Sequence, residues 1–332
     1  MDILNNAVIT YDSIKASVEV TEKELSDFSV EKGDLLFQRS SETLEDVGRA
    51  NVYMDYKTAV FGGFVIRGKK KGKYDPQYFN YLLRSPFARK RIIPMGAGAQ
   101  HFNIGQEGLS KVKLHFANIE EQKKIGKMLS LLDERIATQT KIIEDLKKLK
   151  SAISHILFSS KCTNHLSYIA NVVMGQSPSS NAYNDQGIGM PLVQGNLDIS
   201  NGKTTPRLYT AEFNQTAEEG NIILTVRAPV GEVAKATKKV CLGRGVCAII
   251  PHEENMSDFI YQYLTFYKFM WRRYEQGSTF TSINGSDVRN ILCPEVRNVS
   301  ILTLLDKKIS TEERVVKLYQ LQKLYMLYQM FI

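Results

Sequence analysis

The sequence predicts an α+β protein with two mixed α/β domains joined by two long helices, which pair as an antiparallel coiled coil with pseudo-two-fold symmetry. Three observations predict this fold class. The 332 residues suffice for about two domains. Short motifs occur twice, in the same order and roughly 170 to 190 residues apart. Each copy ends in a long segment with apolar residues at coiled-coil spacing.

The repeated motifs indicate a duplicated domain-plus-helix. They pair segment 31–36 with 218–223, segment 98–104 with 277–283, and segment 131–136 with 304–309. Solenoid repeats recur every ~20–50 residues, so this much longer period does not indicate a solenoid. A duplicated unit folds with a pseudo-two-fold axis, and such a protein suits a target with two parts.

The first domain is predicted at residues 1–117, as short strands and turns with one helix. Apolar strands are predicted at 35–37 and at 61–66, where glycines allow close backbone approach. Apolar residues at helical spacing predict a helix over 76–91. An alternating pattern at 112–114 predicts a final strand.

A basic stretch lies inside this first domain. From Arg67 to Arg91 there are nine Lys or Arg residues and one acid, Asp75, with aromatic residues interleaved. That mixture favours phosphate contact over a merely solvated surface. The whole chain has a net charge of +8 and a pI near 9.1, which suits a nucleic-acid partner.

The two long helices are predicted at residues 118–160 and 298–332. In the first helix the apolar seam is broken at Gln139 and Lys150. A helix with an exposed apolar stripe is not stable alone in water, so we expect an antiparallel pair. The alternative is that each helix folds onto its own domain. The residues expected at the helix-pair interface are Leu129, Leu132, Ile136, Ile143, Leu302, Leu305, Ile309 and Val316.

The second domain is predicted at residues 161–297 and repeats the first with clearer signals. A strand is predicted at 222–226 and an aromatic-rich helix at 258–274. About 25 residues at its start, 165–189, have no counterpart before the first domain. We therefore expect the first domain to be shortened at its N-terminus.

Composition excludes several classes of protein. The hydrophobic fraction, 43%, suits globular cores, and no apolar run approaches the ~20 residues of a membrane span. No signal peptide is visible, so we expect a cytoplasmic protein. The four cysteines form no C-x-x-C pair, and we expect free thiols and no metal site.

The sequence carries none of the common catalytic motifs. It has no Walker A loop, no complete dinucleotide-binding fingerprint, no G-x-S-x-G elbow and no H-E-x-x-H motif. It also lacks a nuclease pattern and the signature of an adenine methyltransferase. We therefore predict a binding protein with no catalytic residues, built from two globular domains and a helical spacer.

At this point the motifs resemble a known family, the specificity subunits of type I restriction–modification systems. The segment 220–231 looks like the family's strand-and-loop motif, and 242–245 and 277–283 sit where its next blocks belong. The segments 119–125 and 131–136 look like its central conserved helix. The second helix departs from the pattern, because it lacks the Glu-Glu-Gln start. The resemblance covers essentially the whole chain.

The resemblance implies a non-catalytic, cytoplasmic subunit that binds a bipartite double-stranded DNA site, each target-recognition domain reading one half. The partners implied are a methyltransferase subunit, expected in two copies, and a motor-nuclease subunit. The assembled complex would methylate adenine and cleave DNA with ATP, as a defence against foreign DNA. S-adenosylmethionine, ATP and magnesium would belong to these partners, so no cofactor is expected in this subunit. No membrane partner is implied.

The residues expected to contact DNA are polar and basic. In the second domain they are Gln176, Ser177, Ser179, Asn181, Arg227, Lys235, Arg244, Ser278, Thr279 and Asn284. In the first domain they are Arg39, Arg67, Lys69, Lys70, Lys71 and Gln100. Arginine side chains fork onto guanine or clamp phosphate, whereas a structural ion pair is the alternative for Arg244. Trp271 and Phe280 are expected in the core.

Two other functions remain open from the sequence. The chain could be a helical scaffold or regulatory remnant of such a subunit, and it would then show no salt-dependent DNA affinity. A self-sufficient nuclease would need a metal-binding acidic cluster, which the sequence does not display.

Overall fold

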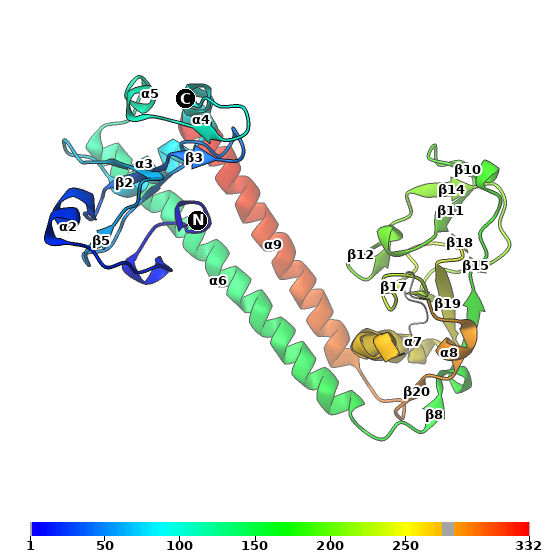
Figure 1. Ribbon diagram of the computed structural model, residues 1–332. Helices are drawn as coiled ribbons and strands as arrows, with labels where there is room; N and C mark the ends of the chain where they lie inside the picture. Colours follow the sequence, from blue (N-terminus) through cyan, green and yellow to red (C-terminus); the bar gives the residue numbers. More distant parts are fainter. Residues whose placement is uncertain (1, 274–281, 332) are drawn as a thin grey trace. The chain divides into compact units, whose positions relative to one another are not determined.

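The computed structural model describes residues 2–273 and 282–331 and divides into two compact units (Figure 1). The first unit comprises Met1–Ile142 with Glu312–Ile332, and the second unit is Ile143–Thr311. Two long helices, α6 (Ile119–Phe158) and α9 (Ser300–Met330), contribute residues to both units. Their bounds lie within two residues of those predicted from the sequence.

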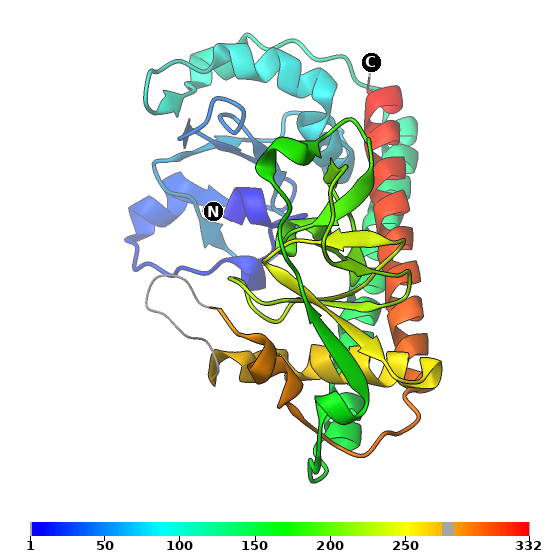
Figure 2. The same ribbon diagram turned by 90° about the vertical axis from the view of Figure 1, so that its right-hand side faces the viewer.

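The two long helices run antiparallel. Asp133 of α6 pairs with Lys323 of α9 at 2.5 Å, and Lys150 of α6 pairs with Asp306 of α9 at 2.6 Å. Partner numbers therefore fall along α9 as they rise along α6, and both views show the helices side by side (Figures 1 and 2). The predicted antiparallel pairing is confirmed, and the alternative in which each helix folds only onto its own domain is wrong.

The two breaks in the apolar seam are filled by polar contacts between the helices. Gln139 donates a hydrogen bond to Glu312, and Lys150 forms the ion pair with Asp306. Of the eight residues expected at the helix-pair interface, five are buried and three are half-buried. The buried ones are Leu129, Leu132, Ile143, Leu302 and Ile309, and the half-buried ones are Ile136, Leu305 and Val316.

The first unit is a three-stranded antiparallel sheet, ordered β4-β2-β6, with short helices and two small strand pairs, β1-β5 and β3-β7. Its elements are α1 (Asp2–Asn5), η1 (Tyr11–Ser13), α2 (Glu22–Phe28), β1 (Ser29–Val30), β2 (Leu35–Gln38), β3 (Ser40–Ser41), β4 (Ala50–Val52), β5 (Ala59–Val60), β6 (Val65–Gly68), α3 (Pro76–Arg84), α4 (Pro86–Ile92), η2 (Ile93–Met95), β7 (Phe102–Asn103) and α5 (Gln106–Ser110). Helix α3 packs through Tyr78 and Leu82 against Leu129 of α6 and against Phe331, which follows the end of α9.

The second unit contains a six-stranded sheet, β12-β13-β17-β16-β19-β9, and a five-stranded sheet, β10-β14-β11-β18-β15, beside the pair β20-β8. Its strands are β8 (Asn164–His165), β9 (Ala170–Met174), β10 (Tyr183–Asn184), β11 (Met190–Val193), β12 (Ile199–Ser200), β13 (Lys203–Thr204), β14 (Leu208–Thr210), β15 (Thr216–Ala217), β16 (Ile222–Thr225), β17 (Val233–Lys235), β18 (Val240–Leu242), β19 (Val246–Pro251) and β20 (Leu292–Cys293). Its helices are η3 (Leu166–Tyr168), η4 (Ser180–Ala182), η5 (Asn196–Asp198), η6 (Glu254–Met256), α7 (Ser257–Tyr267), η7 (Lys268–Arg273) and α8 (Gly285–Arg289).

The central strand of the second unit, β16, lies between two hydrophobic clusters. Ile222 and Leu224 face the cluster that includes α7, whereas Ile223 faces a second cluster with Val193 and Val240. Alternate side chains of a strand point to opposite faces, so a continuous apolar run is what a strand buried on both sides requires. This explains why the apolar run at 222–226 predicts a strand so clearly.

The sequence repeat is also a repeat of hydrogen bonds. In the first unit the backbone N–H of Ile104 donates to the carbonyl of Arg39 at 2.9 Å, directly after β2. In the second unit the N–H of Ile283 donates to the carbonyl of Val226 at 3.0 Å, directly after β16. Both isoleucines are buried. The duplicated motifs therefore hold one loop against the end of the central strand in each unit.

The aspartate of each repeated Leu-Leu-Asp motif makes the same two contacts. Asp133 accepts a hydrogen bond from the Tyr81 hydroxyl of α3 at 2.8 Å, besides its ion pair with α9. Asp306 accepts one from the Gln262 amide of α7 at 2.7 Å, besides its ion pair with α6. In each unit this carboxylate joins a short helix to both long helices.

Several predicted elements need correction. The strand expected at 61–66 is wrong over most of its length, because residues 61–64 form the turn between β5 and β6, and open space surrounds the Cβ positions of Gly62 and Gly63. The first domain, expected to hold one helix, also contains α1, α2 and α5.

The helix expected over 76–91 is divided at Ser85, because the residue before a proline disfavours the helical region and Pro86 starts α4. The strand expected at 112–114 is irregular backbone. The α-helix expected over 258–274 ends at Tyr267, where a 3-10 helix follows, and residue 274 lies outside the described residues.

Candidate functional site

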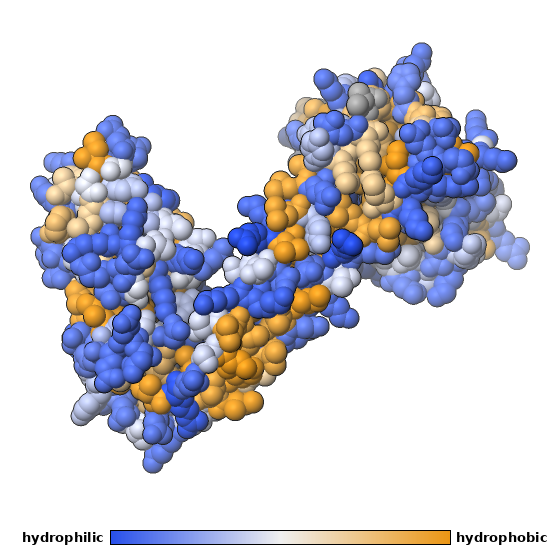
Figure 3. All heavy atoms as spheres, turned by 180° about the vertical axis from the view of Figure 1, so that it is seen from behind, coloured by the Kyte–Doolittle hydropathy of each residue, from blue (hydrophilic) through white to orange (hydrophobic). Residues whose placement is uncertain are grey.

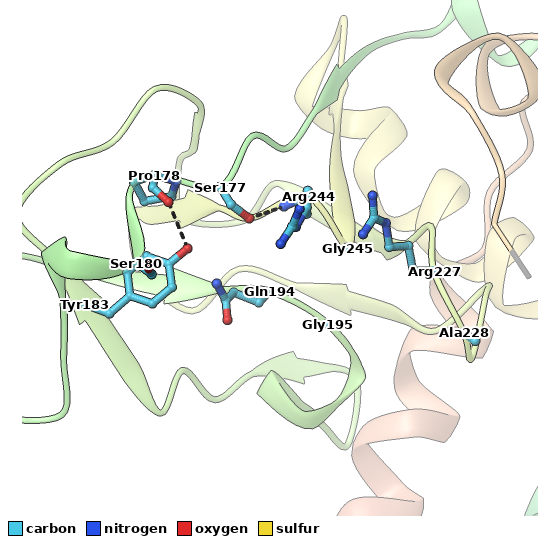
Figure 4. A pocket seen from close by; sticks show the side chains of 10 residues that line it. All are labelled: Ser177, Pro178, Ser180, Tyr183, Gln194, Gly195, Arg227, Ala228, Arg244 and Gly245. Carbon is cyan, nitrogen blue, oxygen red and sulfur yellow. Dashed lines mark hydrogen bonds between the residues drawn. The ribbon is translucent and has the colours of Figure 1, made fainter. Parts of the chain in front are cut away.

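An open pocket of about 580 Å³ lies in the second unit (Figure 4). Its lining comes from the loop after β9, the end of β11, the loop after β16 and the loop between β18 and β19. The lining residues are Ser177, Pro178, Ser180, Tyr183, Gln194, Gly195, Arg227, Ala228, Arg244 and Gly245. Ser177, Arg227 and Arg244 were predicted from the sequence, so the structure brings three of the candidate residues together.

Arg244 is presented by a glycine-rich turn that fits closely against its neighbours. A Cβ atom on Gly245 would lie 2.0 Å from the carbonyl oxygen of Gln194, and one on Gly243 would lie 2.8 Å from its Cγ. The backbone N–H of Arg244 donates to the Ser177 hydroxyl at 3.0 Å. Its side chain is exposed while its backbone is fixed on both sides.

Arg227 is presented by a loop that the buried residue Thr225 closes. The Thr225 hydroxyl donates to the carbonyl of Pro229 at 2.7 Å and accepts from the N–H of Glu232 at 2.9 Å. Gly231 adopts a φ of +90°, and a Cβ there would lie 2.3 Å from the buried Trp271 ring. The loop is therefore fixed at both ends, and Figure 4 shows Arg227 and Arg244 projecting from separate loops into the pocket.

The other polar groups of the pocket are also held in place. The Tyr183 hydroxyl donates to the carbonyl of Pro178 at 3.1 Å, and the N–H of Gln194 donates to the buried Asp198 at 2.9 Å. Gln194 keeps its side-chain amide facing the pocket (Figure 4). Within residues 2–273 and 282–331, neither Arg227 nor Arg244 has a carboxylate at ion-pair distance.

This arrangement can bind an anion or read the edge of a base. An arginine offers five N–H donors in a planar fork, which fits phosphate or the O6 and N7 atoms of guanine. A glutamine amide can pair with the N6 and N7 atoms of adenine. No acidic side chain lines the pocket, so nothing in its lining repels a nucleic acid.

Lys235 differs from these two arginines because it forms an ion pair with a carboxylate. Its ammonium lies 2.5 Å from Asp258, which also accepts a hydrogen bond from Thr303 at 3.1 Å. Burial alone would raise the pKa of Asp258, but the hydrogen bond and charge of Lys235 outweigh burial and lower that pKa. Lys235 thus helps to hold the sheet against α7 and α9.

The remaining candidates of the second unit are spread around the pocket. Gln176, Ser179 and Asn181 are exposed in the segment that leads into it. Asn284 is the N-cap of α8, where its side-chain oxygen accepts from two backbone N–H groups. Ser278, Thr279 and Phe280 lie outside the described residues. Trp271 is buried in the core, as predicted.

The candidates of the first unit divide into residues paired with acids and residues that are exposed. Arg67 is nearly buried and pairs with Asp34 at 2.6 Å and with Glu31 at 3.4 Å. Lys69 lies 3.8 Å from Glu31. The exposed candidates are Arg39, Lys70, Lys71 and Gln100.

Sequence reasoning missed Tyr183 and Gln194. Tyr183 begins the short strand β10 and Gln194 follows β11, and neither residue belongs to a repeated motif. The glycines at 243 and 245 leave room for the backbone and side chain of Gln194, but only the pairing of β11 with β18 reveals this contact.

In the part of the chain that the structure describes, no group of three or more His, Cys, Asp or Glu residues could hold a metal ion. Within the same residues, no helix has the length and apolar character needed to cross a membrane.

A duplicated α+β unit with an arginine-lined pocket is suited to binding an anionic partner. Comparisons with known proteins specify the class. A family model described as the type I restriction modification DNA specificity domain matches residues 1–148 and again 163–317. A putative type I restriction enzyme MjaX specificity subunit from Methanocaldococcus jannaschii is 30% identical over 302 residues, which cover 83% of this chain and 71% of that protein.

Two solved structures have a similar fold. The S subunit of a type I restriction–modification system from M. genitalium matches with a TM-score of 0.60 and 19% identity, covering 92% of this chain and 84% of that one. The HsdS subunit from Thermoanaerobacter tengcongensis matches with a TM-score of 0.50 and 20% identity, covering 91% and 79%.

The chain belongs to the family of type I restriction–modification DNA specificity subunits, and it carries the specificity domain twice. It is a DNA-recognition subunit and has no catalytic role of its own. The resemblance read from the sequence is confirmed.

Proposed function

We propose that this chain reads a bipartite DNA site, one half with each of its two recognition domains, at residues 1–117 and 161–297. The observation that carries the proposal is the pocket in the second unit, where Arg227 and Arg244 face open space without a carboxylate partner among the described residues. Arginines that are not paired within the protein remain available for phosphate or base edges.

Within this proposal the candidate residues have different roles. Arg227, Arg244 and Gln194 contact base edges or the adjacent phosphates, and Gln176, Ser177, Ser179 and Asn181 border the same loops. Lys70 and Lys71 of the first unit are exposed and contact the backbone of DNA. Lys235 and Arg67 act by positioning, because their charges are already paired with Asp258 and Asp34.

The partners proposed are two copies of a methyltransferase subunit and a motor-nuclease subunit. Support for docking on the long helices is an exposed apolar surface, visible in Figure 3 as orange side chains along them. Towards the C-terminal end of α9 the exposed apolar side chains are Leu318, Leu321 and Leu324, and the exposed aromatic side chains beside them are Tyr325 and Tyr328. Met326 and Met330 of the same helix are partly buried and pack against the core of the first unit.

We further propose that S-adenosylmethionine, ATP and magnesium are held by these partner subunits. Membership of this family supports the proposal that the subunit has no cofactor of its own. A cytoplasmic location fits a protein that acts on DNA beside these partners.

The proposed DNA function is tested by sequencing the methylated positions in the genome of a strain with and without this gene. We expect methylated adenines in one bipartite motif, present only with the gene. A methylome that is identical in both strains, while the partner subunits are expressed and assembled, would favour the scaffold alternative.

Docking is tested with the double substitution Tyr325→Ser and Tyr328→Ser. Size-exclusion chromatography with light scattering should show fewer methyltransferase copies per chain. Tyr168→Ser is the matched control, because Tyr168 is equally exposed but lies on a short helix of the second unit. Retention of two copies by the double variant would refute docking at these tyrosines.

A further inference from the structure

A second pocket, of about 250 Å³, lies in the first unit and is cationic. Arg84 and Arg89 enter it from α3 and α4, and Arg49 enters from the residue before β4. Its other walls include Ile3 and Leu83, which are apolar, and the exposed residue Glu45. Three arginines thus line one small space.

Among the described residues, the hydrogen-bond acceptors of Arg84 and Arg89 are backbone carbonyl groups only. The Nε and Nη2 atoms of Arg84 donate to the carbonyls of Ala50 at 3.3 Å and of Asn6 at 3.0 Å. The Nη2 atom of Arg89 donates to the carbonyls of Glu45 and Val47, both at 2.7 Å. The Nη1 atom of Arg89 is buried and has no hydrogen-bond partner among the described residues.

The negative charges near the pocket do not neutralise these two arginines. Asp46 pairs with Arg49 at 2.7 Å. The Asp133 carboxylate attracts Arg84 electrostatically but does not bond to it. The hydrogen-bond partners of that carboxylate are Tyr81 and Lys323. Among the described residues, the Glu45 carboxylate is at ion-pair distance from none of the three guanidinium groups.

Burial of these cations has a measurable physical cost. Desolvation, followed by repulsion from Arg49, lowers the pKa of Arg89 to about 10. Desolvation also lowers the pKa of Arg84. A buried cation without an anion is unfavourable, so a bound anion would stabilise this arrangement.

The fold itself does not require arginines here. The residue before β4 is Arg49, whereas the residue before its counterpart β17 is Glu232. That acid pairs with Lys268 at 2.5 Å. The ninth residue of α3 is Arg84, whereas the ninth residue of α7 is Thr265. The second unit thus builds the same elements with a complete ion pair.

We propose that the pocket formed by Arg49, Arg84 and Arg89 binds a phosphate group. Phosphate presents several oxygens to several N–H donors at once, which matches converging guanidinium groups better than a single carboxylate would. The apolar walls at Ile3 and Leu83 leave room for a carbon group attached to the phosphate. The phosphate is either free in solution or part of a DNA backbone, and the latter source rests on the proposed function.

The first test is thermal unfolding of the full chain in phosphate and in chloride at equal ionic strength. The melting temperature should rise with inorganic phosphate along a saturating curve, because a ligand of the folded state stabilises it. Arg49→Gln should raise the phosphate concentration needed for half the effect about tenfold, since one charge-assisted contact is lost. Arg207→Gln is the matched control, because Arg207 is an equally exposed arginine paired with an aspartate in the second unit.

The second test measures affinity for duplex DNA in the assembled complex. If the phosphate belongs to DNA, Arg49→Gln should weaken binding more than Arg207→Gln, and inorganic phosphate should compete with DNA. If it is free, phosphate should stabilise the chain while both variants bind DNA equally. The proposal is overturned if phosphate and chloride give the same melting temperature and Arg49→Gln binds DNA like Arg207→Gln. Loss of all DNA binding with phosphate stabilisation retained would contradict only the proposed function.

Discussion

The two units use arginine in opposite ways on one duplicated scaffold. The loop after β16 presents Arg227 to open space and has no acid before Glu232. The loop after β2 carries Glu42, Glu45 and Asp46, and its unit keeps the guanidinium groups of Arg84 and Arg89 largely buried. The contacts that close each loop are the same, so the difference lies in the residues that the loops carry. The two copies therefore share the loop-closing hydrogen bonds and differ in the charged residues of their loops.

The largest effect is expected at the glycines that close these loops. Gly48 and Gly231 both adopt positive φ, and their added Cβ atoms would lie 2.7 Å from Ile92 and 2.3 Å from Trp271. Gly231→Ala should lower the free energy of unfolding by about 2–4 kcal/mol and Gly48→Ala by about 1–3 kcal/mol. Urea unfolding measures both. Gly72→Ala, which meets open space, should change stability little, and equal loss in all three would break the comparison.

The next effect concerns DNA binding by the second unit. If Arg227 reads a base edge, Arg227→Ala should weaken binding by about 1–3 kcal/mol and relax specificity at one position. If it clamps phosphate, binding should weaken uniformly across sequences and the salt slope should fall. Titration of the assembled complex with labelled duplexes separates the two cases. Binding equal to that of Arg207→Ala would remove Arg227 from the site.

A smaller effect is expected at the repeated aspartates. Asp133→Asn and Asp306→Asn each weaken one partly buried ion pair, and each should reduce stability by about 1 kcal/mol. The two losses should be equal, because the contacts are equivalent. Denaturant unfolding of each variant checks this expectation. A loss confined to one of them would show that the duplicated contacts do not contribute alike.

The smallest effect is a difference in alkaline stability. Burial raises the pKa of Cys247 and Cys293 to about 12, and all four cysteines lie in the second unit. The folded state favours the neutral thiol. The contribution of each buried thiol to the free energy of unfolding is therefore complete below pH 9 and is lost as pH rises from 9 towards 12. By pH 9.5 the loss should be below about 1 kcal/mol per thiol.

The first unit should lose stability at a higher pH than the second unit. Burial, with a smaller effect of Asp34, raises the pKa of Tyr74 to about 12 from an ordinary value near 10. Unfolding followed from pH 8 to pH 10 checks the difference, with Cys247→Ala as the control that removes one thiol. A free energy of unfolding that stays constant from pH 8 to pH 10 would contradict the expected effect of the buried thiols.

Much of the framework was predictable because local pattern determines it. Apolar periodicity located α6 and α9, and the repeated motifs identified the equivalent loops of the two units. The break at Ser85 was missed because apolar spacing continued across it, although Pro86 was a local signal. The pocket was only partly predictable. Arg227 and Arg244 stood in recognisable motifs, whereas Gln194 reaches the pocket through strand order, which sequence spacing does not reveal.

The ion pairs were the least predictable feature. Lys235 and Arg227 look alike as isolated basic residues, but of these two only Lys235 has an acid across from it among the described residues, on α7. That acid is 23 residues away in sequence. Which cations are available for a ligand therefore depends on the fold and not on local sequence.

The hydrogen bond that closes the loop after β2, and the one that closes the loop after β16, also bear on how this protein can evolve. In the first unit the N–H of Gly48 donates to the carbonyl of Gln38, and in the second the N–H of Gly231 donates to that of Thr225. The first loop spans ten positions (48 minus 38) and the second spans six (231 minus 225), yet both end in the same hydrogen bond. Residues between these anchors can be inserted, deleted or exchanged while the sheet stays intact. Under the proposed function, a change in DNA preference could arise from a short exchange of sequence within the loop that carries Arg227.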